Sequence, residues 1–322
     1  LPTLRKLFPY SEISWVVNTS FRSLLEGHRD LDHVIAYDRG GAGISHRSIG
    51  ATARLCSRLP DEKFDLPIDL QGLLRSGLMT AATRSDVRLG LDDAREGAGW
   101  FYTDRVNAPR KSVHAVDRVL RIARALGDPD PEPAFHLPLG ESHLHWAREA
   151  LGNLPRPLLV VNMGARWLTK RWPPEHFAEV ARRASIRAGA SIIAVGAPED
   201  RPLAQAFGER LGSIPFLDLS GKTTLLQLAA IAKLSDLFLS NDTGPLHLAA
   251  AADAAVVGVY TCTDPRLTGP YGKRATVVKS CVWCAPSFRK TCDRLECLAE
   301  LSPDRVWPVV STRLQDRRES AA

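Results

Sequence analysis

The stretch that most constrains the fold is residues 236–251, which reads as a buried strand, a polar turn and a helix of small residues. The apolar run 237–239 leads into the turn at Asp242, and Pro245 suits the first turn of a helix. Amide groups in that first turn have no partner within the helix, and the helix dipole attracts an anion to them. Phosphate is the obvious candidate, and His247 lies within the same turn. A capped helix with a surface histidine explains the segment equally well.

Length and composition indicate a globular protein with an anionic partner. The chain has 322 residues, of which 44% are hydrophobic, enough for two domains. No apolar run approaches the roughly 20 residues that span a bilayer, and no secretory leader opens the chain, so we expect a soluble, cytoplasmic protein. The net charge of +6 comes from scattered basic residues. That pattern favours a phosphorylated substrate or an acidic membrane surface and excludes a recognisable nucleic-acid module.

Strands and helices alternate along the first part of the chain, as in a doubly wound α/β sheet. We expect strands at 13–17, 33–37, 64–70 and 87–89, and helices at 1–8, 20–26, 47–58, 71–82 and 113–126. A domain of this class normally begins on a strand near the middle of its sheet. Because this chain begins on what reads as the following helix, we expect a first strand and its ligand-facing turn to precede Leu1.

The segment 127–140 has the composition of an extended linker, with four prolines. A helix at 141–151 and a second strand–helix series follow it. The expected strands are 158–162, 191–195, 216–219, the apolar run 237–239 and 255–260. The expected helices begin at 173–174, span 202–211 and 225–233, and start at about Pro245. We therefore predict two Rossmann-like domains facing a cleft, 1–135 and 136–322, the second ending in a cysteine-rich tail.

The segment 221–224, Gly-Lys-Thr-Thr, resembles the end of a nucleotide-triphosphate loop. That loop needs a glycine five residues before the Gly-Lys pair, where this chain has Phe216. We reject the loop and expect Thr224 to cap the next helix. Lys170, in the loop after strand 158–162, could reach a phosphate at the neighbouring strand end, or it could be a solvated loop lysine.

Four cysteines near the C-terminus have the spacing of possible metal ligands: Cys281, Cys284, Cys292 and Cys297. Structural zinc usually takes two paired C-x2-C knuckles, and here only the first pair has that spacing. Zinc is one interpretation, and disulfides are less expected in a reducing cytosol. Two further cysteines read as ordinary core thiols.

Several motifs carry a closer resemblance. They are Asp242-Thr243-Gly244-x2-His247-Leu248, Val259-Tyr260-x2-Thr263-Asp264-Pro265, Lys170-Arg171-Trp172-Pro173, Gly196-Ala197-Pro198, Ile68-Asp69-x-Gln71-Gly72-Leu73-x-Arg75-Ser76, Ala94-Arg95-Glu96 and His114-Ala115-Val116-Asp117-Arg118. With these motifs the chain closely resembles the lipopolysaccharide heptosyltransferases, glycosyltransferase family 9. The resemblance covers nearly all of the chain.

The resemblance implies a GT-B fold and metal-independent, inverting transfer of heptose from ADP-heptose to the lipid A–Kdo inner core. The enzyme would work at the inner face of the cytoplasmic membrane, as a peripheral protein. The implied donor-binding residues are Thr243, Gly244 and His247 for the diphosphate, Asp242 for the turn or the sugar, Asp200 for the ribose and Thr223 near the adenine. Lys170 would neutralise the leaving ADP. Arg75 and Arg95 would meet the phosphorylated acceptor.

The chain also departs from the family pattern. The family's proposed general base is an aspartate in a Gly-Asp pair after the first strand, which we expect upstream of Leu1, and no carboxylate of this chain replaces it by motif. Ala165 and Arg166 stand where the first-heptose enzyme has two threonines, and the cysteine-rich tail is closer to second-heptose enzymes. The alternatives are a family member that binds nucleotide sugar but is catalytically impaired, a transferase using another nucleotide sugar, and a non-sugar nucleotide-binding regulator.

Overall fold

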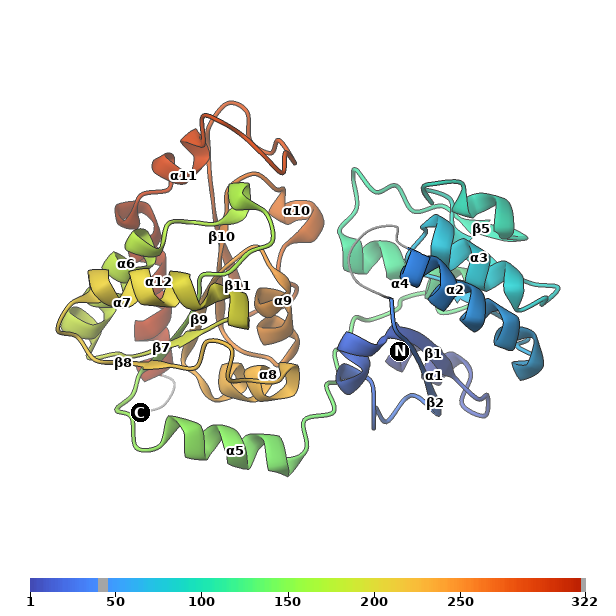
Figure 1. The fold of residues 1–322 in the computed structure, drawn as a ribbon, viewed down its shortest axis with the longest axis horizontal. Coiled ribbons are helices and arrows are strands. Elements are labelled where there is room, and N and C mark those ends of the chain that lie inside the picture. The colour runs from blue at the N-terminus through green and yellow to red at the C-terminus, as the bar shows by residue number, and fades with distance from the viewer. Residues whose placement is uncertain (40–45, 320–322) are drawn as a thin grey trace. The chain divides into compact units, whose positions relative to one another are not determined.

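The computed structural model describes residues 1–39 and 46–319. The chain divides into two compact units, an N-terminal unit (Leu1–Pro138) and a C-terminal unit (Leu139–Ala322), shown in Figure 1. The division falls within the proline-rich segment that contains the predicted boundary at 135/136. No helix among the described residues is both long and apolar enough to cross a membrane.

The C-terminal unit is built on one six-stranded parallel sheet. Its strands are β6 (Leu158–Asn162), β7 (Ser191–Val195), β8 (Phe216–Asp218), β9 (Leu237–Asn241), β10 (Val256–Tyr260) and β11 (Ala275–Lys279). Their spatial order is β11-β10-β9-β6-β7-β8, the doubly wound order in which the direction of winding reverses between β6 and β9. Every residue of β6, β9 and β10 is buried, because helices cover both faces of the sheet.

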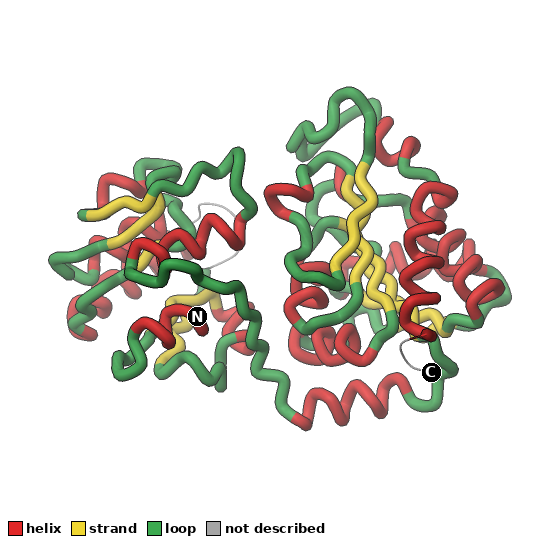
Figure 2. The backbone as a smooth tube through the Cα atoms, turned by 180° about the vertical axis from the view of Figure 1, so that it is seen from behind, coloured by secondary structure: helices red, strands yellow, loops and turns green. Residues whose placement is uncertain are grey.

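Helices lie on both sides of this sheet, as Figure 2 shows. They are α5 (Glu141–Leu151), α6 (Pro174–Ala188), α7 (Arg201–Leu211), α8 (Leu225–Leu234), α9 (Gly244–Ala251), α10 (Pro265–Thr268), α11 (Glu296–Glu300) and α12 (Pro303–Glu319), with single 3-10 turns η4 (Leu168–Lys170) and η5 (Pro198–Asp200). The main core joins the sheet to α6, α7 and α12. The series of strands and helices expected over 141–260 is therefore present.

The sequence reading did not anticipate β11 or α12. Helix α12 buries Val306, Val310 and Leu314 in the main core, which also contains Phe177 of α6. Pro308 lies inside the helix, and proline disfavours a helical interpretation of a sequence. The C-terminal helix is therefore part of the core of this unit.

The N-terminal unit contains two smaller parallel sheets. Strands β1 (Ser14–Asn18) and β2 (His33–Tyr37) pair with each other, and β3 (Ile68–Asp69), β4 (Leu89–Leu91) and β5 (Asp104–Val106) form the second sheet. The helices are α1 (Pro2–Leu7), α2 (His46–Arg58), α3 (Leu74–Ala82) and α4 (Ala115–Ala125), with 3-10 turns η1 (Thr19–Leu24), η2 (Leu59–Glu62) and η3 (Ala98–Phe101). The expected first strand stays a prediction.

Three expected elements of this unit differ in the structure. The helix expected from residue 71 begins at Leu74, because Asp69 Oδ1 accepts the amides of Gln71 and Gly72 at 2.9 and 3.0 Å and forms a turn. The strand expected over 64–70 shortens to β3, since Pro67 has no N–H to give to a ladder. The helix expected at 20–26 is the 3-10 turn η1, and β5 was not anticipated.

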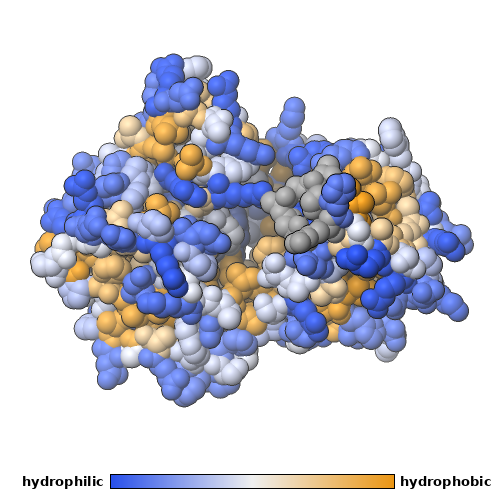
Figure 3. Space-filling view, viewed as in Figure 1, coloured by the Kyte–Doolittle hydropathy of each residue, from blue (hydrophilic) through white to orange (hydrophobic). Residues whose placement is uncertain are grey.

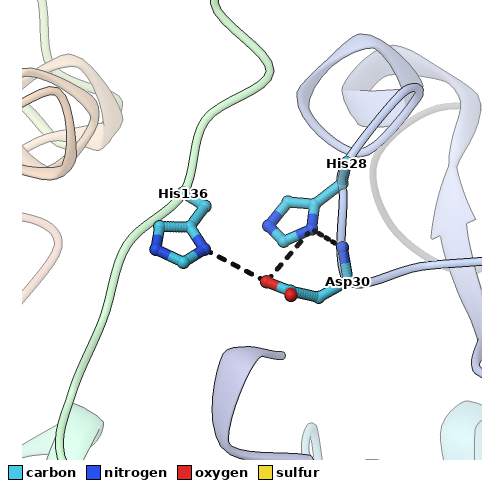
Figure 4. Close-up of side chains that lie close together, drawn as sticks. All are labelled: His28, Asp30 and His136. Atoms are coloured by element: carbon cyan, nitrogen blue, oxygen red, sulfur yellow. Dashed lines mark hydrogen bonds and ion pairs between the residues drawn. The ribbon is translucent and has the colours of Figure 1, made fainter. Parts of the chain in front are cut away.

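A small polar network fixes the proline-rich segment to the N-terminal unit. Asp30 Oδ2 lies 3.1 Å from His136 Nδ1 and 3.8 Å from His28 Nδ1, as Figure 4 shows. The Arg29 guanidinium lies 2.7 Å from His136 Nε2. Burial lowers the pKa of His28, so this ring stays neutral near pH 7.

Candidate functional site

The candidate site lies at the carboxyl ends of β6 and β9, where the winding of the sheet reverses. Asp242 directly follows β9, and Lys170 is on η4 in the loop after β6. Lys170 Nζ donates to Asp242 Oδ2 at 2.5 Å, and Thr263 Oγ1 donates to the same oxygen at 2.6 Å. His247 Nε2, in the first turn of α9, lies 3.5 Å from Asp242 Oδ1. Two side chains from loops, Lys170 and Thr263, and one from the first turn of α9, His247, therefore converge on one carboxylate.

Asp242 is held ionised by these neighbours. Its side chain is 5% exposed, and burial alone raises the pKa of a carboxyl group. Hydrogen bonds from His247, Lys170 and Thr263 outweigh burial and lower the pKa of Asp242 to about 2. Nearby Tyr260 has a raised pKa, first because it is buried and second because of the Asp242 charge. Asp242 thus presents a fixed negative charge that orients Lys170 and His247.

Helix α9 offers an open N-terminus beside this carboxylate. The N-cap residue Thr243 makes no side-chain capping bond, so its hydroxyl is not committed to the helix. A Cβ built on Gly244 would meet no protein atom within 4 Å. The space next to Gly244 is therefore open, and the N-terminal end of the helix dipole favours an anion there.

Buried polar contacts fix the loop that carries Lys170. Asn241 donates from Nδ2 to Met163 O at 2.7 Å and accepts the amide of Trp172 at 3.0 Å, so it holds both ends of the loop. Thr261 Oγ1 donates to Thr169 O at 2.6 Å, next to Lys170. Because these contacts tie the loop to the sheet, the Lys170 ammonium is placed without help from a ligand.

The cysteine-rich segment adds positive charge next to this loop. Thr169 Oγ1 donates to Arg289 O at 2.7 Å, which attaches the segment to η4. Two ammonium groups lie close to the Trp167 ring, with Lys170 Nζ 4.7 Å and Lys290 Nζ 5.7 Å from its centroid. Sequence reasoning gave Trp167, Lys290 and the Thr263 hydroxyl no role. The sequence signal that could have pointed to these residues was weak, because it consisted only of aromatic and basic residues in predicted loops.

Asp200 and Thr223 lie on two adjoining turns of the C-terminal unit. Asp200 Oδ2 accepts the amide of Ala197 at 2.9 Å, and a Cβ on Gly164 would lie 2.2 Å from that oxygen. The Asp200 carboxylate is therefore beside the loop after β6. Gly221 donates its amide to Gly196 O at 2.8 Å, so the turn leading to Thr223 packs on the turn leading to Asp200.

The expected cap of α8 is confirmed. Thr224 Oγ1 accepts the amide of Gln227 at 3.2 Å, and Gln227 Oε1 accepts the amide of Thr224 at 2.8 Å. Residues 221–224 therefore form a turn that leads into α8. This agrees with the expectation that the segment caps a helix and is not a nucleotide-triphosphate loop.

Arg75 and Arg95 lie on neighbouring segments of the N-terminal unit. Arg95 donates its amide to Gly72 O at 2.8 Å, and a Cβ on Gly72 would lie 3.3 Å from Ala94 Cα. These segments follow β3 and β4, so both arginines lie past the carboxyl ends of adjacent parallel strands.

The four tail cysteines do not form a ligand cluster. Metal-ligand atoms of His, Cys, Asp or Glu come within 4.8 Å of one another, in a group of three or more, at one place among the described residues. That group is His28, Asp30 and His136. The Arg29 guanidinium at 2.7 Å from His136 makes that group an ion-pair network rather than a cation site. The zinc interpretation of the cysteines gains no support from the geometry.

A doubly wound parallel sheet with an open helix N-terminus and a fixed lysine at its switch point is typical of nucleotide-binding α/β proteins. Comparison with known proteins is more specific. The family described as Glycosyltransferase family 9 (heptosyltransferase) matches residues 52–298. The chain therefore belongs to glycosyltransferase family 9 and is a glycosyltransferase.

Relatives and solved structures agree with this assignment. Lipopolysaccharide heptosyltransferase 1 of Pseudomonas aeruginosa is 30% identical over 89% of this chain and 80% of its own length. Lipopolysaccharide core heptosyltransferase OpsX of Haemophilus influenzae is 26% identical over 85% of this chain and 77% of its own length. The structure of E. coli heptosyltransferase WaaC with ADP is 26% identical, with a TM-score of 0.73 over 97% of this chain and 94% of that one. The fold is GT-B, with two Rossmann-like units.

Proposed function

We propose that the protein transfers heptose from ADP-heptose to the inner core of lipopolysaccharide, with inversion and without a metal ion. The observation that carries the proposal is the Lys170–Asp242 pair, 2.5 Å apart, beside the open N-terminus of α9. The family relatives support the choice of donor and acceptor, because their names give lipopolysaccharide heptosyltransferase activity, and one solved relative carries ADP.

The diphosphate of the donor binds at the first turn of α9 in this proposal. Thr243 and Gly244 supply amides and a hydroxyl, and His247 supplies a ring nitrogen from the same turn. Asp242 does not contact the diphosphate, since like charges repel. It holds Lys170 and His247 in place. Asp200 receives the ribose hydroxyls, and Thr223 lies toward the adenine on the adjoining turn.

The chemistry is a single displacement at the anomeric carbon. A hydroxyl of the acceptor forms the new C–O bond as the bond from heptose to the β-phosphate breaks, and the acceptor proton leaves to a base. Negative charge grows on the departing ADP. Lys170 and the amides of α9 are already aimed at that charge, and such pre-positioned groups stabilise a transition state more than a ground state.

The acceptor binds to the N-terminal unit in this proposal. Arg75 and Arg95, on adjacent segments past β3 and β4, pair with phosphate groups of the lipid A core, because guanidinium groups bind phosphate in a two-point manner. Lipid A resides in a bilayer, so the protein works at the inner face of the cytoplasmic membrane as a peripheral protein.

Donor discrimination tests this proposal. The full chain is incubated with heptose-deficient lipid A core and, in turn, ADP-heptose, ADP-glucose, GDP-mannose and UDP-glucose, while calorimetry measures the affinity for each donor. We expect transfer from ADP-heptose. Transfer from another nucleotide sugar would replace heptose in the proposal. Tight binding of ADP-heptose without turnover would support an impaired, binding-only member instead, and equal affinity for ADP and all ADP-sugars without turnover would indicate a nucleotide-binding regulator.

A further inference from the structure

Large apolar side chains are exposed together on the N-terminal unit. Trp100 on η3 is 85% exposed, Leu74 and Leu78 on α3 are 43% and 40% exposed, and Val87 is 45% exposed. Isolated exposed leucines are ordinary, whereas a group of four that includes a nearly fully exposed tryptophan indicates an interaction surface. We call these four residues the α3–η3 face.

The members of this face lie on elements that pack directly against one another. Gly77 of α3 is the contact point, since a Cβ there would lie 2.9 Å from Phe101 and 3.0 Å from Ala98 of η3. Leu74 lies three positions before Gly77, and Leu78 lies one position after it. The two leucines therefore flank this contact on the helix surface. Figure 3 shows apolar side chains gathered over α2 and α3 on this unit.

Arginine side chains flank the tryptophan. Arg88, next to Val87, donates from Nε to Phe101 O at 2.8 Å, and Arg105 donates from Nη2 to Gly99 O at 2.6 Å. Both guanidinium groups therefore bond to carbonyls on either side of Trp100, and these bonds do not neutralise their charge. Exposed Arg84 lies between α3 and Val87 in the chain.

The part of the chain that forms this face has fewer exposed acidic residues than arginines. The exposed carboxylates are Asp86, Asp92, Glu96 and Asp104, against Arg75, Arg84, Arg88, Arg95 and Arg105. Asp93 is paired with Arg110 and Arg118 and so adds no free negative charge. The face therefore combines an aromatic and aliphatic centre with a net positive rim.

We propose that the α3–η3 face docks on an anionic lipid bilayer surface, with Trp100 at the level of the headgroups and the two leucines against the acyl boundary. Tryptophan and leucine with flanking arginines are the residue types that bind such an interface. The inference rests on the proposed function, which puts a lipid-borne acceptor on the same elements. Arg75 lies on α3 itself, and Arg95 lies in the turn that leads to η3. Docking by this face would bring those arginines to the plane of the acceptor phosphates.

Vesicle co-sedimentation tests the docking. The full chain is mixed with phosphatidylcholine vesicles, with or without phosphatidylglycerol. We expect wild-type protein to sediment with the anionic vesicles. Trp100→Ser and the double variant Leu74→Ser/Leu78→Ser should each lower the partition coefficient by about tenfold, and Arg84→Gln by about fivefold. The matched control is Trp283→Ser, because Trp283 on the C-terminal unit is 81% exposed and should leave partitioning unchanged.

Unchanged partitioning of the Trp100 variant, or an equal loss in the Trp283 variant, would overturn the proposal. So would a wild-type dimer, detected by sedimentation equilibrium, that Trp100→Ser dissociates, because the face would then bind a second copy. Thermal unfolding verifies that each variant is folded. Transfer to acceptor core freed of its acyl chains separates this proposal from the proposed function: Trp100→Ser should keep that activity and lose activity on acceptor in vesicles. Vesicle binding through Trp100 without any transfer would leave the docking intact and refute the activity alone.

Discussion

Lys170 Nζ lies 2.5 Å from Asp242 Oδ2, although 72 positions separate the two residues in the chain. They meet because β6 and β9 are adjacent parallel strands, which places the loops after them at the same edge of the sheet. The pair joins an ammonium group to the turn that begins α9. In the proposed function this ammonium group stabilises the leaving ADP.

Replacing the Lys170 charge should slow transfer more than it weakens donor binding. We expect Lys170→Ala to lower kcat by about a hundredfold, since one pre-positioned charge on a leaving group has that order of effect. Lys170→Arg should keep part of the rate because it retains the charge. Steady-state kinetics measure both. The control is Lys273→Ala at an exposed lysine outside the site, and an equal loss in that variant would contradict a specific role for Lys170.

Stability should depend on the ionisation of Asp242. Its pKa is lowered from 3.8 to about 2 in the folded protein, so its contribution is present above pH 4 and is lost as the pH falls toward 2. The shift corresponds to about 2 kcal/mol at pH 7. Urea unfolding should therefore show Asp242→Asn to be less stable than wild type at pH 7. A difference that does not shrink between pH 4 and pH 2 would refute this account of Asp242.

Gly164 should be irreplaceable because of Asp200. A Cβ at position 164 would lie 2.2 Å from Asp200 Oδ2, so Gly164→Ala must displace the carboxylate. We expect weaker binding of ADP by calorimetry. Asp200→Ala should weaken binding too, and the double variant should be no worse than the poorer single one, since both act through the same group. Additive losses would show that the two residues act separately.

Gly244→Ala should weaken ADP binding without displacing any side chain, in contrast to Gly164→Ala. No protein atom lies within 4 Å of the added Cβ, so the free energy of unfolding should change little. The methyl group would nevertheless occupy the open space assigned to the diphosphate. ADP affinity should therefore fall while the midpoint of thermal unfolding stays near that of wild type. Unchanged affinity would place the diphosphate elsewhere.

Helix α12 should contribute to the stability of the C-terminal unit. Leu314 is fully buried in the main core, and we expect Leu314→Ala to cost about 2–5 kcal/mol, the usual range for deleting a buried leucine side chain. Chemical unfolding measures it. Gln315→Ala, at an exposed position of the same helix, is the control. A cost below about 1 kcal/mol for Leu314→Ala would mean that α12 is only peripherally attached.

Sequence patterns predicted the C-terminal sheet well, because its strands are continuous apolar runs bounded by turn residues. They also predicted the cap at Thr224, which depends on local spacing alone. They failed at α3, where the local turn at Asp69 delays the start of the helix, and at α12, where core packing stabilises the helix despite Pro308. The site was predicted as a list of residues. Its geometry was not, since no spacing shows that Thr263 and Lys170 share one oxygen of Asp242.

The central claim is that this protein moves heptose from ADP-heptose to the lipopolysaccharide core with the help of Lys170. Mass spectrometry of heptose-deficient lipid A core, after incubation with the full chain and ADP-heptose, tests it most directly. We predict that wild-type protein adds a single heptose, whereas Lys170→Ala yields little product in the same time. No added heptose with wild-type protein, or equal addition by the two proteins, would contradict the account.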